Sequence, residues 1–255
     1  QARELFLLPE EAKERLQDLP SGRQRGYTPF GVERAKGRKV GDRKEFWHVG
    51  RELPEDHPYR RAGYMRPNLL PDQAPDFREA TLALFEAMDV LAASVLRRVG
   101  AFLGSEPDWL PEIARDGNSI LRLIHYPDSG EGVAPAGSER AAPHEDVNLV
   151  TLLPAATGPG LQLLTREGEW LEVNPPPGGI VCDVGDMMTL LTGGRLTATT
   201  HRVVNPRGAG EGARLSMPFF VHPRPDALLR PHGSAEPGVT AHDFLHDRLS
   251  ANKVK

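Results

Sequence analysis

The chain has 255 residues, of which 39% are hydrophobic and 26% charged, and its formal charge is -4. All-β folds of this length routinely form one core, so we expect a single domain. Without a basic surplus we expect no nucleic-acid partner. No apolar run approaches the roughly 20 residues that span a bilayer, so we expect no membrane partner and a cytoplasmic location. A monomer or a small homo-oligomer is expected.

Residues 1–119 are predicted to form a helical and loop region that packs on the core. The chain starts at Gln1 rather than Met, and we expect that some of the protein's N-terminal part precedes it. Between residues 77 and 103, apolar side chains recur at spacings of three and four, which predicts a long amphipathic helix. These side chains belong to Leu84, Phe85, Met88, Leu91, Val95, Leu96, Val99 and Phe102.

Residues 120–230 are predicted to form the core, because short apolar runs alternate with Gly and Pro, as in "ILRLIHYP", "VNLVTLLP" and "GIVCDVGDMMTLL". The run "LLTREGEWLEV" predicts a hairpin with its turn at Glu167 to Glu169. Many short strands with tight turns favour a sandwich or a barrel, with the long helix over one face. A helical tail is predicted over residues 231–255, and all three parts are expected to form one structural domain. The predicted class is mainly β with flanking helices.

Three side chains form a candidate metal site. His144 and Asp146 are two residues apart in a predicted strand, so they project from the same face. His201 lies in the later strand-like run "LTATTHRVVNP". Two His and one carboxylate form a facial triad that leaves coordination positions open, which favours catalysis over a structural zinc site. Taken alone, such a pattern often arises by chance, and a strand His is more often a packed residue than a ligand.

A candidate anion site follows the second His. Arg214 and Ser216 in "ARLSMPFF" are again two apart on one face. The planar guanidinium of Arg matches a carboxylate with two parallel hydrogen bonds, and a hydroxyl adds a third. The pair therefore predicts an anchor for a dicarboxylate, and the alternative is a surface Arg on a strand.

The order H-x-D, then His, then R-x-S resembles the iron(II)- and 2-oxoglutarate-dependent dioxygenases of the isopenicillin N synthase-like family. The similarity extends to "LRLIHYP", to the whole stretch from "GLQLLTREGEWLEV" to "HRVVNP", and to the earlier "GYTPFGVE". It implies a double-stranded β-helix, or jelly roll, with a long supporting α-helix. It also implies an enzyme that uses Fe(II), 2-oxoglutarate and O2 to oxidise a small-molecule substrate, most often by hydroxylation, with release of succinate and CO2.

The resemblance assigns roles to individual residues. The triad matches the family's iron ligands, while Arg214 and Ser216 match the pair that binds the far carboxylate of 2-oxoglutarate. Tyr126 matches a Tyr that supports that carboxylate. Ile124 stands where plant relatives usually have Asn, which predicts one polar contact fewer to the co-substrate. Phe220 matches a position that stacks on aromatic substrates in flavonoid-modifying, flavonol synthase-like relatives, with core packing as an equal alternative.

Other polar residues are interpreted as structural. We expect Cys182 to be a buried, inert thiol, and Asp183 and Asp186 to be structural, with Gly185-Asp186 forming a turn between strands. His242 and His246 are expected on an exposed helix face. A basic run is interpreted as a solvated loop, and it comprises Arg34, Lys36, Arg38, Lys39, Arg43 and Lys44.

Two alternative functions remain at this point. The first is an iron oxidase of the isopenicillin N synthase type, which uses no 2-oxoglutarate and would release no succinate. The second is a catalytically silent jelly-roll binding protein, which would fail to bind iron(II). Candidate substrates are a flavonoid-like phenol, an amino-acid derivative or another secondary metabolite.

Overall fold

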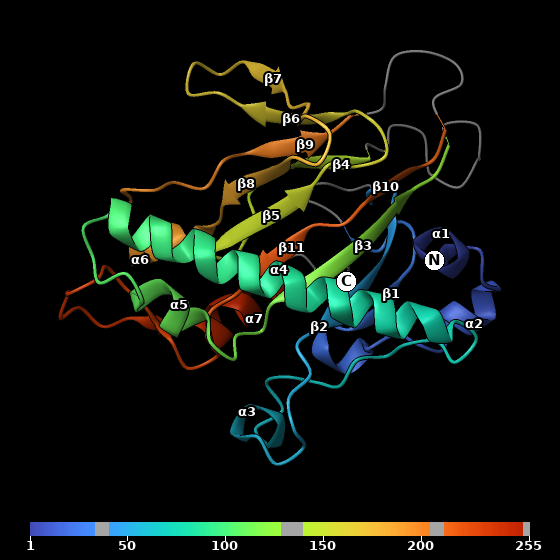
Figure 1. Ribbon diagram of the computed structural model, residues 1–255, viewed down its shortest axis with the longest axis horizontal. Coiled ribbons are helices and arrows are strands. Elements are labelled where there is room, and N and C mark those ends of the chain that lie inside the picture. The colour runs from blue at the N-terminus through green and yellow to red at the C-terminus, as the bar shows by residue number, and fades with distance from the viewer. Residues whose placement is uncertain (34–40, 129–139, 205–211, 252–255) are drawn as a thin grey trace.

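Two antiparallel sheets face each other in the computed structural model, which describes residues 1–33, 41–128, 140–204 and 212–251 (Figure 1). The main sheet has the order β1-β2-β3-β11-β5-β8, and β10 also pairs with β3. The small sheet has the order β4-β9-β6-β7. This arrangement confirms the predicted mainly β fold. The strands of the main sheet are β1 (Gly26–Thr28), β2 (Glu45–Gly50), β3 (Ile120–Tyr126), β5 (Val150–Pro154), β8 (Ile180–Val184), β10 (Arg214–Ser216) and β11 (Phe219–Val221), and those of the small sheet are β4 (Ala141–His144), β6 (Leu161–Leu164), β7 (Trp170–Glu172) and β9 (His201–Val203).

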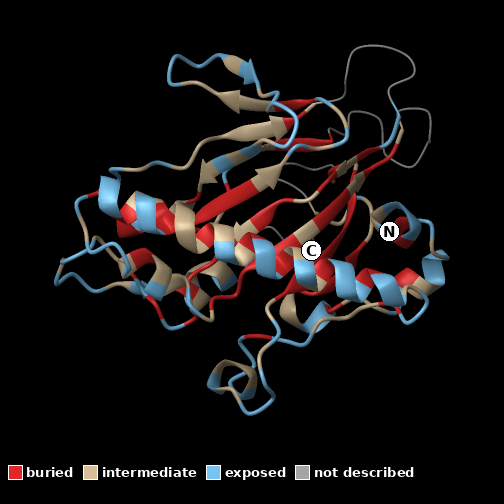
Figure 2. Cartoon of the chain, in the orientation of Figure 1, coloured by how far each residue is buried: buried red, intermediate tan, exposed pale blue. Residues whose placement is uncertain are grey.

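A long helix, α4 (Pro75–Phe102), crosses the outer face of the main sheet, as the apolar spacing predicted (Figure 1). Its buried residues follow one another at intervals of three and four, whereas the opposite side of the helix is exposed (Figure 2). Among the described residues, no helix combines the length and the apolar character that a membrane crossing requires. The remaining elements are α1 (Ala2–Phe6), α2 (Glu10–Glu14), the 3-10 helix η1 (Leu19–Ser21), α3 (Pro58–Arg61), α5 (Trp109–Ala114), α6 (Asp186–Leu191), α7 (Ala241–Ala251), and the strand pair β12 (Leu228–Leu229) and β13 (Val239–Thr240).

The two faces of β3 have different surroundings, because successive side chains of a strand point to opposite sides. Leu121 and Leu123 belong to the large apolar core beneath α4. Ile124 and Tyr126 belong to a smaller cluster with residues of the small sheet, so they lie between the two sheets. The inner face of the main sheet is therefore the face on which a site between the sheets is built.

The N-terminal part contributes strands to the same sheet as the core. All six residues of β2 pair with β3, and β1 pairs with β2. The hairpin predicted around residues 167–169 is present, since β6 and β7 are joined by a turn in which the amide of Gly168 donates to the carbonyl of Thr165 at 3.0 Å.

The segment after β8 differs from the prediction, which placed a turn between strands at Gly185-Asp186. It is a helix, α6, with Met187, Met188 and Leu191 buried at helical spacing. Gly185 allows the close approach to the segment that leads into β5, because an added Cβ would lie 2.3 Å from the backbone oxygen of Asn148.

Two further predictions are wrong. Cys182 is exposed rather than buried, because it lies on β8, the edge strand of the main sheet. Lys44 is buried rather than solvated, and its ammonium contacts carboxylate oxygens of Glu33 at 2.7 Å and Asp42 at 2.9 Å. Arg34, Lys36, Arg38 and Lys39 of the same basic run lie outside the described residues.

Candidate metal centre

The two predicted His ligands are opposite each other on neighbouring strands of the small sheet. His144 ends β4 and pairs in register with His201, the first residue of β9. Their ring centroids are 4.4 Å apart. Antiparallel pairing therefore brings together two residues that are far apart in the sequence, with both side chains on the face that meets the main sheet.

Asp146 completes the triad from the turn after β4, not from within the strand as predicted. Its Oδ1 atom is 3.9 Å from Nε2 of His144 and 3.9 Å from Nε2 of His201. One ligand atom of each residue lies within 4.8 Å of the others, and no second group of this kind occurs among the described residues. The structure thus brings the three predicted side chains to one point, where they fit a metal with open coordination positions.

The carboxylate of Asp146 is held by the neighbouring strand. The hydroxyl of Thr151 on β5 donates to Oδ2 of Asp146, and the side-chain amide of Asn148 donates to that hydroxyl at 2.7 Å. The backbone amide of Asp186 donates to the backbone oxygen of Asp146 at 2.8 Å. Oδ1 remains the oxygen that faces the two imidazoles.

Both imidazoles are oriented through their Nδ1 atoms. Nδ1 of His144 lies 2.7 Å from the backbone oxygen of Ala142. Nδ1 of His201 lies 3.3 Å from a carboxylate oxygen of Asp183 and 3.2 Å from the backbone oxygen of Thr199. These acceptors favour the tautomer protonated at Nδ1, which leaves the Nε2 lone pairs available to a metal.

The surroundings of His201 attract a cation. Burial acts to lower the pKa of His201, but the hydrogen bond to Asp183 and the charge of Asp146 raise it to about 9. Burial and the nearby His201 lower the pKa of His144. The sequence interprets Asp183 as structural, and the structure places its carboxylate against His201. Its sequence signal was an acidic residue within an apolar strand run.

Arg214 has the properties of an anion anchor. The residue is only 3% exposed, and its Nε atom donates to the backbone oxygen of Gly158 at 2.9 Å. Its Nη1 atom is buried and has no hydrogen-bond partner within the described ranges. Burial lowers the pKa of Arg214 from its usual value. A buried guanidinium with an unpaired donor fits a carboxylate ligand, because unpaired buried donors are costly.

The other predicted co-substrate residues lie beside Arg214. In the pairing of β10 with β3, Arg214 is opposite Tyr126 and Ser216 is opposite Ile124, so all four share the inner face. The guanidinium carbon is 5.1 Å from the centre of the Tyr126 ring. Ile124 belongs to the apolar cluster between the sheets, which is consistent with the missing polar contact. Their roles in co-substrate binding remain predictions.

A cavity of about 130 Å³ adjoins Arg214 between the sheets. Its walls include Leu153, Leu161 and Val181, so its lining is largely apolar around one guanidinium. This volume is about an order of magnitude more than one water molecule needs.

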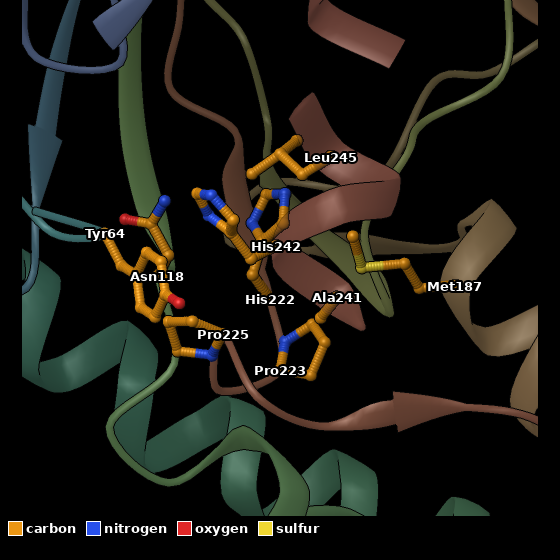
Figure 3. Close-up of a pocket in the computed structure, with 9 residues that line it drawn as sticks. All are labelled: Tyr64, Asn118, Met187, His222, Pro223, Pro225, Ala241, His242 and Leu245. Carbon is orange, nitrogen blue, oxygen red and sulfur yellow. The ribbon is translucent and has the colours of Figure 1, made fainter. Parts of the chain in front are cut away.

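A second hollow lies at the end of β11 beside α7, and Figure 3 shows the residues that line it. Its volume is only about 10 Å³, roughly the space of one water molecule. His242, on its wall, stacks on Tyr64 with ring centroids 4.3 Å apart, and its ring is 6.3 Å from that of His246. The described residues provide no third ligand for this His pair.

Comparison with known proteins identifies the class. A family model described as 2OG-Fe(II) oxygenase superfamily matches residues 117–223, which include the triad and Arg214. A second model, described as non-haem dioxygenase in morphine synthesis N-terminal, matches residues 1–73.

The chain is also similar to individual proteins over most of its length. It is 31% identical to a 2-oxoglutarate-Fe(II) type oxidoreductase of Aspergillus fumigatus, over 97% of this chain and 77% of the relative. A solved structure from Caulobacter crescentus, described as a 2OG-Fe(II) oxygenase family protein, is 39% identical with a TM-score of 0.84, and covers 98% of this chain and 82% of that one. A full-length Neurospora crassa protein, solved in complex with alpha-KG and thymine, is 26% identical with a TM-score of 0.81, over 98% and 81% of the two chains.

The chain therefore belongs to the 2OG-Fe(II) oxygenase superfamily. Its cofactor is Fe(II), and its co-substrates are 2-oxoglutarate and O2.

Proposed function

We propose that this protein hydroxylates a small organic molecule, with conversion of 2-oxoglutarate to succinate and CO2. The observation that carries the proposal is the convergence of His144, Asp146 and His201 on the same side of the main sheet as the buried Arg214, whose Nη1 has no partner among the described residues. The similarity to a structure bound to alpha-KG and thymine supports both the co-substrate and the size class of the substrate.

Each part of the reaction has residues to support it. The triad would hold iron(II) from one side and leave positions for ligands on the other. The chemistry that iron(II) and 2-oxoglutarate supply when bound is activation of O2, with one oxygen atom entering succinate and the other entering the product.

The protein's own contribution is orientation and exclusion of water. Arg214 would pair with the far carboxylate of 2-oxoglutarate through its unpaired Nη1, while Ser216 and Tyr126 flank it. The apolar cluster beside them keeps water from this pair, which strengthens the interaction of opposite charges.

Within the superfamily, we place the chain in the isopenicillin N synthase-like branch, a proposal supported by the match of its N-terminal part to the non-haem dioxygenase model. We further propose a cytoplasmic monomer or small homo-oligomer, which light scattering after gel filtration would test. An iron oxidase that uses no 2-oxoglutarate is disfavoured by the similarity to a 2-oxoglutarate-Fe(II) type oxidoreductase and to a structure bound to alpha-KG.

The test combines binding and turnover. Under anaerobic conditions, iron(II) and 2-oxoglutarate should together give the visible charge-transfer absorption of their chelate, and O2 should then release succinate. Replacement of Arg214 by Met should weaken 2-oxoglutarate binding by at least about tenfold, the size of a charge-assisted hydrogen bond. Iron(II) affinity should be retained.

Arg202 provides the matched control for this substitution. It also contacts an aromatic ring, 3.9 Å from the centre of Trp170, but it lies on the other face of β9 from His201 and donates to Gln162 at 2.9 Å. Arg202→Met should leave 2-oxoglutarate binding unchanged. An unaltered affinity in Arg214→Met, or succinate formation without added iron, would contradict the proposed function.

A further inference from the structure

A second arginine lies on the inner face of the main sheet, and 2-oxoglutarate does not account for it. Arg122 on β3 is two residues before Ile124 and four before Tyr126, so it shares their face. Arg214 is opposite Tyr126, towards one end of β3, whereas Arg122 lies towards the other end. The side chain of Arg122 is 17% exposed, so part of it is accessible.

The contacts of Arg122 fix its guanidinium but leave one donor unused. The guanidinium carbon is 4.2 Å from the ring centre of Phe46 and 5.0 Å from that of Phe220. Nε donates to Nε2 of His48 at 2.6 Å, and Nη1 donates to Glu33 at 3.2 Å. Within the described part of the chain, Nη2 donates no hydrogen bond. A rigid, partly accessible guanidinium with a free donor is suited to bind a planar anion.

The neighbouring groups neutralise the charge of Arg122 only in part and do not use all of its hydrogen-bond donors. His48 accepts from Arg122, so it is neutral, and burial followed by the charge of Arg122 lowers its pKa well below the usual value. Glu33 is the only carboxylate that contacts Arg122 among the described residues, and it lies closer to Lys44, at 2.7 Å. Asp42 offsets Lys44 as well, at 2.9 Å. Arg122 thus has one single-point ionic contact and spare donor capacity.

Arg122 is also close to the metal ligands. Phe220, which it contacts, is opposite Thr151 in the pairing of β11 with β5, and Thr151 donates to Asp146. Burial opposes the charge of Glu33, but its two cationic partners and, more weakly, His144 hold the pKa of Glu33 well below its usual range. The pairing of β11 with β3 and β5 thus puts Arg122 and Asp146 on the same face of the sheet, with Phe220 and Thr151 between them.

We propose that Arg122 binds a carboxylate of the primary substrate, so that the enzyme acts on small organic acids. This inference rests on the proposed function and names the substrate class of the same site. Phe220 then packs against the carbon skeleton next to that carboxylate, in agreement with its predicted role as a substrate contact. Two arginines on one sheet face thereby bind two different acids: Arg214 binds 2-oxoglutarate and Arg122 binds the substrate.

The experiment compares carboxylic acids with their primary amides, which have the same skeleton without the charge. Benzoate and benzamide, 3-phenylpropanoate and 3-phenylpropanamide, and hexanoate and hexanamide are added to the anaerobic iron(II)–2-oxoglutarate protein. The readouts are the change in the visible charge-transfer absorption and, after O2 is admitted, succinate formation above the rate without additive. We expect acids to act at concentrations at least about tenfold lower than their amides, as a charge-assisted hydrogen bond allows.

Three variants assign the preference to Arg122. Arg122→Gln should bind acids and amides about equally, whereas Arg202→Gln, the control outside the site, should keep the preference for acids. Arg122→Lys keeps the charge but loses the planar fork, and it should retain part of the preference. If Arg122→Gln does not fold, Arg122→Lys and the comparison in the unmodified protein still decide.

The outcomes separate this inference from the proposed function. Amides that act as well as acids, a preference that persists in Arg122→Gln, or a panel in which no acid has any effect would each overturn the substrate assignment. In those cases the charge-transfer absorption and the succinate released without additive would remain. Their absence from the unmodified protein would instead contradict the proposed function.

Discussion

Two polar clusters lie on opposite faces of the main sheet, and they differ in whether their groups satisfy one another. On the outer face, Glu45 of β2 is only 2% exposed and accepts hydrogen bonds from three partners. Lys13 donates at 2.9 Å and Tyr27 at 2.6 Å, and Nδ1 of His125 lies at 2.8 Å. This cluster is closed, and it ties α2 and β1 to the sheet.

The cluster on the inner face is open. The three triad side chains approach one another but do not hydrogen-bond, since Oδ1 of Asp146 is 3.9 Å from each imidazole. Nη1 of Arg214 is buried without a partner in the described structure. Buried polar groups are normally satisfied, so an unpaired Arg214 donor on the same sheet face as a set of metal-type ligands indicates a missing ligand. We therefore expect the closed cluster to contribute to the stability of the fold and the open cluster to contribute to the binding of iron(II) and 2-oxoglutarate.

Loss of a triad ligand should have the largest effect on metal binding and on activity. Asp146→Ala removes the only negative charge among the three ligands, and we expect iron(II) binding and succinate formation to fall below detection. The free energy of unfolding of the metal-free protein should change far less. Iron content and succinate release measure the first effect, and denaturant unfolding measures the second.

Glu145→Gln is the control for Asp146→Ala. Glu145 lies between the two ligands in the sequence, but it is exposed and accepts from Thr200. This variant should bind iron(II) normally. A variant of Asp146 that still binds one equivalent of iron(II) with unchanged affinity would show that the triad is not the metal site.

Removal of the Glu45 carboxylate should lower the stability of the protein and leave ligand binding unchanged. Glu45→Ala leaves the buried Lys13 and the partly buried His125 without their carboxylate partner, and we expect the free energy of unfolding to fall by about 3–5 kcal/mol. Iron(II) and 2-oxoglutarate affinity should persist in the folded fraction. Glu11→Gln, which affects the exposed pair with Arg15, should cost no more than about 1 kcal/mol. Equal effects of the two substitutions would show that the closed cluster adds no stability.

The closed cluster also makes stability depend on pH. Burial alone would raise the pKa of Glu45, but hydrogen bonds from His125, Lys13 and Tyr27 lower it overall. A carboxyl with a lowered pKa in the folded state stabilises the protein above its unfolded-state pKa, and this stabilisation is lost as pH falls. The unfolding free energy should therefore decline in acid more steeply in the unmodified protein than in Glu45→Gln. Parallel pH profiles would argue against this source of stability.

The sequence predicted the open cluster better than the closed one, and the reason is the range of the interactions. His144, His201 and Arg214 could be found because the order H-x-D, His and R-x-S resembles a known family, although the triad pattern taken alone often arises by chance. The partners of Glu45 come from a helix and two strands and share no local pattern. Their pairing depends on the register of β1, β2 and β3, which no single segment specifies.

Local geometry explains the smaller errors. The period of H-x-D predicts a strand position for Asp146, but β4 ends at His144 and the loop after it carries the carboxylate. The sequence does not predict the contact of Asp183 with His201, because the two residues lie on different sheets. The residues after Gly185 have a short apolar run that fits either a strand or a helix. In the structure, backbone amides of Gly185, Asp186 and Met187 donate to residues 146–149, which fixes the start of the helix.

Loss of the Asp183 carboxylate, which orients His201, should reduce iron(II) affinity less than loss of a metal ligand. Asp183→Asn weakens the acceptor for Nδ1 of His201, and we expect iron(II) affinity to fall by about 10–100-fold. Calorimetry with manganese(II) in place of iron(II) would measure the change without turnover. Asp186→Asn, which affects a carboxylate that contacts Arg248 at 2.7 Å instead of His201, should leave the affinity unchanged. An equal loss in both variants would indicate a general charge effect rather than orientation of His201.

The smallest expected effect comes from Thr151, which holds Asp146 by a single hydroxyl. Thr151→Val preserves the shape of the side chain, removes the donor to Oδ2 of Asp146, and leaves the Asn148 amide without its acceptor. One neutral donor to a charged acceptor contributes about 1.5–3 kcal/mol at most, and much of this is regained when the metal itself binds the carboxylate. We therefore expect a decrease in metal affinity of severalfold, smaller than in Asp183→Asn. A decrease as large as that of Asp146→Ala would mean that Thr151 determines whether the carboxylate reaches the metal at all, and the site would then depend on β5 as much as on β4 and β9.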